Sequence, residues 1–340
     1  MKTKVLGDEL LYSIHRKVIV LSSGNMPRIT KVSPLSDPIQ ATAKKIRRLE
    51  VQGARNVAIA AIKAIQAHAA KTEAPSKKDF LRELTKAKDT FFASRPTEPL
   101  MRNALRLMIN KVEKDEEKNV KKLAEIVSQA SDQFLSQLEE SSKKIAEIGA
   151  RRIRHDSVIL THCHSSTVTN LLKRAKHEGK TFEVICTETR PVLQGHTTAK
   201  EMLELGVKTN FIVDSAVRFF MNNVDLILVG ADAITSEGNV INKIGTSTVA
   251  LVAHEARTPF YVVSELLKYD PATMYGDYEK IEERSPNEIW KDAPKELIVR
   301  NPAFDVTRRD FIHGIICEEG IISPHSITEV MHRKYPWVFE

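Results

Sequence analysis

The spacing of apolar residues divides the chain into two halves. From about Asp37 to Ile153, apolar residues recur every three or four positions, as on one face of an amphipathic helix. Beyond Val120 this face comprises Leu123, Ile126, Val127, Ala130, Phe134, Leu135 and Leu138. Asp37 followed by Pro38 is a typical helix start. Since no strand-like alternation interrupts this half, we predict a helical domain over residues 37–153.

After Arg154, short β-rich runs alternate with helical patterns. The runs are Val158–Leu160, Phe182–Cys186, Phe211–Val213, Val224–Val229 and Phe260–Val263. Alternating units of this length predict a parallel sheet covered by helices on both faces. The fold class is therefore α/β, with a Rossmann-like parallel-sheet domain over residues 154–340. Residues 1–36 are an N-terminal extension of unknown role, in which Lys17–Leu21 has the composition of a strand.

Polar segments follow four of these strands. Ligands of open parallel sheets bind beyond the carboxyl ends of the strands. The segments are His162–Ser166, Thr187–Pro191 with Gln194–His196, Gly230–Asp232 with Asn242–Thr246, and Ser264–Glu265 with Lys268. A thiol (Cys163), a carboxylate (Asp232) and three cations (Arg190, Lys243 and Lys268) thus converge on one edge. This combination predicts a site for an anionic ligand.

Cys163 is the central candidate. It follows an apolar run and precedes a helical pattern, Thr167–Lys176. A helix N-terminus and the neighbouring imidazoles of His162 and His164 can lower the pKa of a thiol, which makes Cys163 a candidate acid, base or nucleophile. The alternative is a buried and inert core cysteine. Asp232 has a similar alternative as a turn or N-cap residue.

The candidates indicate proton transfer. The sequence contains no G-x-S-x-G, no G-x-x-x-x-G-K-[ST] and no G-x-G-x-x-G motif, which disfavours hydrolase, P-loop and dinucleotide-binding functions. A capping-box pattern at Thr198–Glu201 assigns Glu201 a structural role. A Cys/Asp pair beside phosphate-binding cations fits moving a proton between adjacent carbons of a sugar phosphate. One group must then start as the base and the other as the acid.

The cysteine content indicates the cellular compartment of the protein and whether it binds a metal. Three cysteines, Cys163, Cys186 and Cys317, form neither a disulfide framework nor a metal-ligand spacing. We therefore expect a cytoplasmic protein with no metal or organic cofactor. The N-terminus lacks the apolar core of a signal peptide. The most apolar helical stretch, Val57–Ala70, is broken by polar residues, so no membrane span is expected.

The positive charge lies mostly in the first half. Residues 1–150 carry 28 Lys and Arg against 18 Asp and Glu, whereas the remaining residues carry 23 against 26. Basic and acidic residues are interspersed along predicted helices, as in Lys111–Lys118, which is typical of a solvated face. Aromatic residues, which would stack on bases, make up 6%. Nucleic-acid binding is not expected, and a phosphorylated small molecule is the predicted partner.

Several ordered motifs resemble a known superfamily. They are Gly53-Ala54, Ser94–Thr97, Thr161–Ser165, Thr187–Pro191, Gly230–Asp232, Asn242–Thr246 and Asn301–Thr307. The chain from about Asp37 onward resembles the superfamily of the initiation factor 2B alpha, beta and delta subunits, methylthioribose-1-phosphate isomerase and archaeal ribose-1,5-bisphosphate isomerase. Within it, Thr161-His162-Cys163-His164-Ser165 is most similar to the ribose-1,5-bisphosphate isomerases.

The resemblance implies an aldose–ketose isomerase that converts ribose 1,5-bisphosphate to ribulose 1,5-bisphosphate in AMP salvage. It implies that Cys163 takes a proton from carbon 2 of the ring-opened sugar and that Asp232 relays protons through an enediol(ate). It also implies a homo-oligomer, a dimer or hexamer, and AMP as an activator. The alternatives are methylthioribose-1-phosphate isomerase and a non-catalytic, initiation factor 2B-like regulatory subunit, which would not need both Cys163 and Asp232.

The resemblance also implies a phosphate-binding set. Its matched positions are Arg95, Ser165, Ser166, Arg190, Asn242, Lys243 and Lys268. The chain departs from the pattern at Gln52-Gly53-Ala54-Arg55, where the isomerases usually have Arg-Gly-Ala. Loss of that guanidinium removes a bidentate phosphate donor, and Arg55 is the candidate replacement because a three-residue shift stays near the same helical face. Position 52 therefore bears on which sugar phosphate binds.

Overall fold

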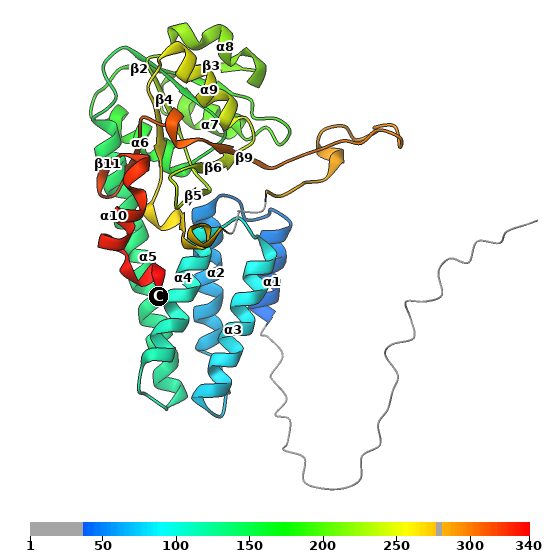
Figure 1. Ribbon diagram of the computed structural model, residues 1–340, viewed down its shortest axis with the longest axis vertical. Coiled ribbons are helices and arrows are strands. Elements are labelled where there is room, and N and C mark those ends of the chain that lie inside the picture. Colours follow the sequence, from blue (N-terminus) through cyan, green and yellow to red (C-terminus); the bar gives the residue numbers. More distant parts are fainter. Residues whose placement is uncertain (1–36, 277–280) are drawn as a thin grey trace, which may run out of the picture. The chain divides into compact units, whose positions relative to one another are not determined.

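The computed structural model describes residues 37–276 and 281–340, which belong to one compact unit. Residues 1–36, with the strand-like run Lys17–Leu21, lie outside the described residues. Five helices come first along the described chain (Figure 1). They are α1 (Asp37–Arg47), α2 (Ala54–Ala69), α3 (Lys77–Ser94), α4 (Pro99–Lys114) and α5 (Val120–Ala150). The helical periodicity of this half is thereby confirmed.

Local sequence signals set the ends of these helices. The Ser76 side chain accepts a hydrogen bond from the Asp79 N–H and caps α3, and Asn119 caps α5 in the same way through Lys121. Pro99, which has no N–H to leave unpaired, occupies the first turn of α4. The apolar stripe of α5 is buried along its length. Its burial holds the 31-residue helix against α2 and α4.

A seven-stranded sheet follows, in the order β11-β10-β7-β4-β1-β2-β3. All its neighbouring pairs are parallel except β10 with β11. The strands are β1 (Ser157–Thr161), β2 (Phe182–Thr187), β3 (Lys208–Ile212), β4 (Leu226–Val229), β7 (Phe260–Val263), β10 (Gly314–Cys317) and β11 (Gly320–Ile322). The five predicted runs match β1, β2, β3, β4 and β7. The predicted α/β class is confirmed.

Helices and 3-10 turns connect the strands. The helices are α6 (Ser166–His177), α7 (Gly195–Glu204), α8 (Val217–Phe220), α9 (Thr246–Ala256) and α10 (Ile327–Lys334). Among the 3-10 turns, η1 (Asp214–Ala216) follows β3, and η3 (Leu266–Lys268) follows β7. Within the described residues no helix is both long and apolar enough to cross a membrane.

A second, four-stranded sheet was not predicted. Its order is β8-β5-β6-β9, with strands β5 (Ala233–Thr235), β6 (Val240–Lys243), β8 (Tyr269–Asp270) and β9 (Phe304–Thr307). Strands of two to four residues are too short for alternation to distinguish them from loops. Asn242 and Lys243, which were assigned to no strand or helix, lie in β6.

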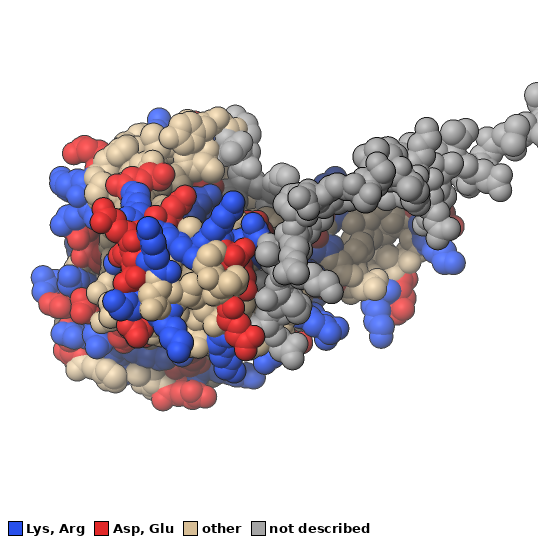
Figure 2. All heavy atoms as spheres, turned by 90° about the horizontal axis from the view of Figure 1, so that it is seen from below, with Lys and Arg blue, Asp and Glu red and all other residues tan. Residues whose placement is uncertain are grey.

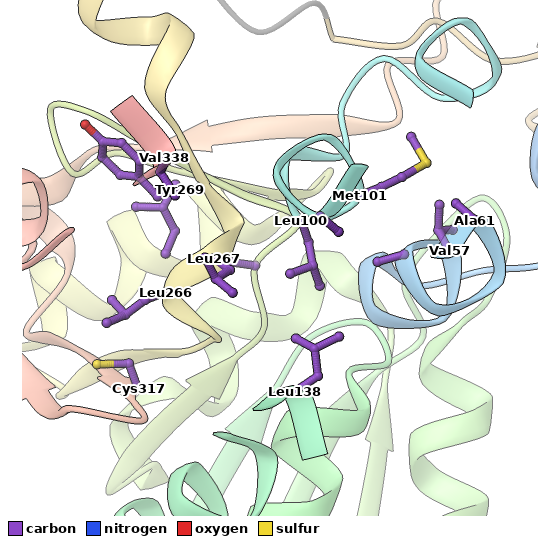
Figure 3. Packing of buried hydrophobic residues seen from close by; sticks show 14 of the residues in the cluster. Val57, Ala61, Leu100, Met101, Leu138, Leu266, Leu267, Tyr269, Cys317 and Val338 are labelled. Atoms are coloured by element: carbon purple, nitrogen blue, oxygen red, sulfur yellow. The ribbon is translucent and has the colours of Figure 1, made fainter. Parts of the chain in front are cut away.

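One apolar core joins the helices to the sheet. Figure 3 shows Val57 of α2, Leu100 of α4 and Leu138 of α5 in one buried cluster with Leu266 and Leu267 of η3. Since this cluster contains residues from both sides of position 154, the proposed boundary between two domains stays a prediction. On the face shown in Figure 2, basic and acidic side chains are interspersed, as a solvated face requires.

Asn103 connects α4 by hydrogen bonds to η3 and β8. Its buried amide donates to the carbonyl oxygens of Leu267 (3.0 Å) and Tyr269 (2.9 Å). Asn103→Ala leaves two buried carbonyl groups unpaired, so the free energy of unfolding should fall by about 2–4 kcal/mol. Urea denaturation measures this change. The exposed residue Asn223 supplies the control, since Asn223→Ala should change stability by less than about 0.5 kcal/mol. Equal effects of the two substitutions would contradict the role of Asn103.

Candidate active site

The chain reverses direction across the sheet between β1 and β4. From β1 it proceeds outward through β2 and β3, and it then returns to pair β4 with the other side of β1. The crevice at such a switch point is where ligands of α/β sheets bind. Cys163 follows β1 and Asp232 follows β4, so the two candidates lie beyond neighbouring strands.

A cavity at this point collects the predicted residues. Those that line it are Gln52, Gly53, Ala54, Arg55, Arg95, Cys163, Ser165, Ser166, Asp232, Asn242, Lys243 and Lys268. Of the predicted set, only Arg190 is missing from the described residues that line the cavity. Arg190 is exposed, and its guanidinium donates to the Ile289 carbonyl at 3.2 Å. Its predicted contact with substrate stays a prediction.

Cys163 is held at three points by the segment that follows β2. Its N–H donates to Thr189 Oγ1 (2.9 Å), and its carbonyl accepts from Thr198 Oγ1 (2.9 Å). Its thiol lies 3.5 Å from Gln194 Oε1. The residue has φ +69°, the left-handed region that is costly for a side chain with a Cβ. The three bonds therefore impose a conformation that the residue would not adopt alone.

The expectation of a lowered thiol pKa is wrong. Burial raises the pKa of Cys163 to about 11, Lys243 opposes the shift, and Asp232 and Asp214 add to it. The thiol is thus protonated at neutral pH. A smaller opposing contribution comes from the His164 N–H, which precedes the N-cap residue of α6, and it does not offset burial.

The flanking imidazoles are turned to other partners. His162 Nε2 lies 2.8 Å from the Ile244 carbonyl, so this nitrogen carries the proton, and Thr187 Oγ1 donates to Nδ1 at 2.7 Å. His164 Nδ1 lies 3.1 Å from Thr198 Oγ1. Burial lowers the pKa of both histidines, so both are neutral at pH 7. Neither supplies the positive charge that would stabilise a thiolate.

Ser165 approaches the end of β4 closely. A Cβ built on Gly230 would lie 2.7 Å from Ser165 Oγ, so the contact requires glycine there. Ser165 is the N-cap of α6, and its side chain accepts from the Val168 N–H. Ser165, Ser166 and Thr167 at the start of α6 line the cavity, and a helix N-terminus at this place favours an anionic group.

Phe304 of β9 positions two cations. Its ring centroid lies 5.1 Å from Lys243 Nζ and 5.8 Å from the Arg95 guanidinium carbon. Phe304 lines the cavity together with Glu282 and Arg284 of the preceding segment. Sequence reasoning missed these three residues because no strand or helix pattern marked their segment. The motif Asn301–Thr307 was the available signal.

Arg55 and Lys268 share the buried carboxylate of Glu265. Arg55 Nη1 and Lys268 Nζ each lie 3.3 Å from an oxygen of Glu265. Burial alone would raise the pKa of Glu265, but the two cations outweigh it and hold the pKa below its usual range. Arg55 also donates to the Leu138 carbonyl (2.7 Å) and to Glu139 (3.0 Å). Most of the N–H donors of Arg55 therefore already form hydrogen bonds with α5 and with Glu265.

The capping box expected at Thr198 is wrong. Helix α7 begins at Gly195, with Gln194 as its N-cap residue. Thr198 lies inside the first turns and bonds to Cys163, as described above. Glu201 pairs with Lys173 at 2.7 Å and lies 3.6 Å from His164 Nε2. Thr198 and Glu201 therefore contact Cys163 and its neighbour His164, respectively.

Comparison with known proteins identifies the family. A protein-family model described as the Initiation factor 2 subunit family matches residues 50–324. The chain belongs to this family. Two curated relatives are ribose 1,5-bisphosphate isomerases. The chain is 42% identical to the Archaeoglobus fulgidus protein (85% of this chain, 90% of the relative) and 38% identical to the Methanocaldococcus jannaschii protein (89% and 97%).

The family also includes other named activities. The chain is 33% identical to a methylthioribose-1-phosphate isomerase from Desulforamulus reducens, over 90% of this chain and 92% of the relative. Among solved structures, a translation initiation factor eIF-2B from Pyrococcus horikoshii OT3 superposes with a TM-score of 0.75 at 29% identity. That comparison covers 85% of this chain and 98% of the other.

Glu98 lies buried behind the cavity wall and should make stability depend on pH. Burial raises its pKa to about 8, although Arg95 Nε is only 3.1 Å away and opposes the shift; Asp232 adds to it. From about pH 4.5 to 8 the folded protein keeps a proton that the unfolded chain releases. Stability should therefore fall as pH rises through this window.

Glu98→Gln removes this titration. The decrease in Tm between pH 5 and pH 8 should be smaller in the variant than in the wild type by about 3 °C or more. The difference between the two pH values carries the test, because the substitution also weakens the pair with Arg95. Glu204→Gln, at an exposed position in α7, should keep the wild-type difference. An unchanged pH dependence in Glu98→Gln would contradict the raised pKa.

Proposed function

We propose that the chain catalyses the aldose–ketose isomerisation of ribose 1,5-bisphosphate to ribulose 1,5-bisphosphate. The observation that carries this proposal is the placement of Cys163 and Asp232 beyond neighbouring strands, in one cavity lined by cations. Chains named ribose 1,5-bisphosphate isomerase that cover 85–89% of this one support the substrate. The product of such a reaction is a ketose bisphosphate.

The charge of the cavity suits a bisphosphate. Five cationic side chains are among the described lining residues: Arg55, Arg95, Lys243, Lys268 and Arg284. The acidic ones are Asp232 and Glu282. Lys243 and Arg95 beside Phe304, and the first turn of α6 at Ser165 and Ser166, are the proposed contacts for phosphate.

The protonated thiol defines the order of proton transfers that we propose. Cys163 gives its proton to the ring oxygen as the bond from that oxygen to carbon 1 breaks. The resulting thiolate takes the proton from carbon 2, and the electron pair forms the carbon 1–carbon 2 double bond of a phosphate-bearing enediol. Asp232 then removes the hydroxyl proton at carbon 2, while the thiol returns a proton to carbon 1. Asp232 finally returns its proton to sulfur.

The two alternatives have less support. The name methylthioribose 1-phosphate indicates a substrate with one phosphate group. The isomerase of that name matches at 33% identity, against 35–42% for the ribose 1,5-bisphosphate isomerases. A non-catalytic initiation factor 2B-like regulator would not need the thiol and the carboxylate in one cavity. Cytoplasmic location, a homo-oligomeric state and activation by AMP follow from composition or family resemblance and stay predictions.

Isomerase assays test the proposal. Wild-type protein should convert ribose 1,5-bisphosphate, and Cys163→Ser and Asp232→Asn should each lower kcat by about 10²–10⁴-fold, because each removes one acid/base group. Product formation can be followed by NMR of the carbon-bound protons. Cys186→Ser is the matched control: this thiol is buried in β2, outside the cavity lining, and the variant should keep wild-type kcat.

Two outcomes would contradict the proposal. Turnover of methylthioribose 1-phosphate with a higher kcat/KM than ribose 1,5-bisphosphate would favour the other isomerase. Absence of turnover with both substrates, by protein that unfolds cooperatively, would favour the regulator.

Lys243→Met should raise KM more than it lowers kcat if Lys243 binds phosphate in the ground state.

A further inference from the structure

Two glutamine amides connect the thiol to the backbone at the mouth of the cavity. Cys163 Sγ lies 3.5 Å from Gln194 Oε1, and Gln194 Nε2 lies 3.3 Å from Gln52 Oε1. Gln52 Nε2 in turn lies 2.9 Å from the Leu49 carbonyl oxygen, in the segment between α1 and α2. The hydrogen bonds are therefore continuous from sulfur to a main-chain carbonyl.

The Leu49 carbonyl determines the direction of every bond in this series. A carbonyl oxygen only accepts, so Gln52 turns its NH2 group to Leu49 and its own oxygen to Gln194. Gln194 then donates its NH2 group to Gln52, which leaves its oxygen facing the sulfur. An amide oxygen accepts a hydrogen bond from S–H and repels a thiolate.

We infer that Gln194 and Gln52 are positioning residues that hold Cys163 in its protonated form, with Gln52 acting through the orientation of the Gln194 amide. The catalytic meaning of this inference rests on the proposed function, in which the thiol supplies the first proton. Neither glutamine needs to touch the reacting carbons for this role.

The backbone on both sides of Gln194 is held in a restricted conformation, which fixes the position of its amide. Thr189 (φ +61°) and Leu193 (φ +58°) both adopt the left-handed region without being glycine. A Cβ on Gly195 would lie 1.7 Å from the Thr187 carbonyl oxygen, so the start of α7 packs directly on the end of β2. This segment gives Cys163 the two further bonds, from Thr189 and Thr198, that fix its backbone.

The charged groups that act on the thiol come from other elements. Lys243 of β6 lowers the pKa of Cys163, whereas Asp232, beyond β4, and Asp214 of η1 raise it. His162 and His164 on its own segment are bound elsewhere and are neutral at pH 7. Because glutamine and methionine are both uncharged, replacing either glutamine by methionine leaves this set of charges unchanged. A change in thiol titration then does not come from a changed charge.

A double-mutant cycle on the full-length protein tests the inference. The variants are Gln52→Met, Gln194→Met and the double variant. The rate at which iodoacetamide alkylates Cys163 is measured from pH 7 to 11 without substrate, and peptide mass spectrometry separates Cys163 from Cys186 and Cys317. Each single variant should move the midpoint of the pH dependence downward and raise the rate at pH 8 by about 3–10-fold.

Coupling between the two sites is the decisive result. If Gln52 acts only by orienting Gln194, the double variant should titrate like Gln194→Met alone. Additive shifts, or a wild-type midpoint in Gln52→Met, would overturn the inference. So would a faster reaction with an unchanged midpoint, which would mean that the substitutions only open the cavity. Gln129→Met, at an exposed position in α5, should match the wild type.

A further variant covers the case in which Gln194→Met does not fold. Gln194→Glu keeps an acceptor oxygen beside the sulfur, so its midpoint should equal or exceed that of the wild type; a lower midpoint would overturn the inference. In active protein, the pH profile of kcat should shift downward in Gln52→Met together with the thiol midpoint. Absence of turnover by the wild type would instead reject the proposed function, and the substrate-free titration would still decide the role of the glutamines.

Discussion

The parallel pairing of β1 with β4 is the constraint on which the candidate site depends. Ile159 pairs with Leu226 and Leu160 with Ile227, so both strands end at the same edge and deliver Cys163 and Asp232 to one cavity. Neighbouring strands lie about 4.8 Å apart, and a thiol moved to the next strand would be about twice as far from the carboxylate. Because the chain leaves β1 on one side and returns on the other, the connecting segments diverge and leave room for a ligand there.

Burial acts on Cys163, Glu98 and Glu265, and local charge decides the direction of the pKa shift for each. Cys163 and Glu98 have raised pKa values because desolvation outweighs Lys243 in one case and Arg95 in the other. Glu265 is equally buried, yet its pKa is lowered because both Lys268 and Arg55 contact it. The same degree of burial thus leaves Glu265 ionised and Cys163 protonated, and such a separation of pKa values is what acid–base chemistry needs.

Backbone strain is concentrated where the thiol is held. Cys163, Thr189 and Leu193 all have positive φ, and each belongs to the turn region at the ends of β1 and β2. Such conformations persist only where surrounding contacts outweigh their cost. Here the contacts are the bonds from Thr189, Thr198 and Gln194, together with the close packing of Gly195 on β2. The polar segment that follows β2 therefore positions the reactive residue at the end of β1.

Much of this protein was predictable from local pattern. Periodicity located the helical half of the chain and the core strands of the parallel sheet. The rule that ligands bind at strand ends then located Cys163, Asp232, Lys243 and Lys268. The second sheet was missed because its strands are too short to show alternation. The role of Arg190, whose guanidinium donates to the Ile289 carbonyl, stays a prediction. The direction of the thiol pKa, the course of the amide bonds through Gln194 and the state of Glu98 depend on burial and on contacts between segments far apart in sequence. Those quantities arise only from packing, so tertiary structure alone decided them.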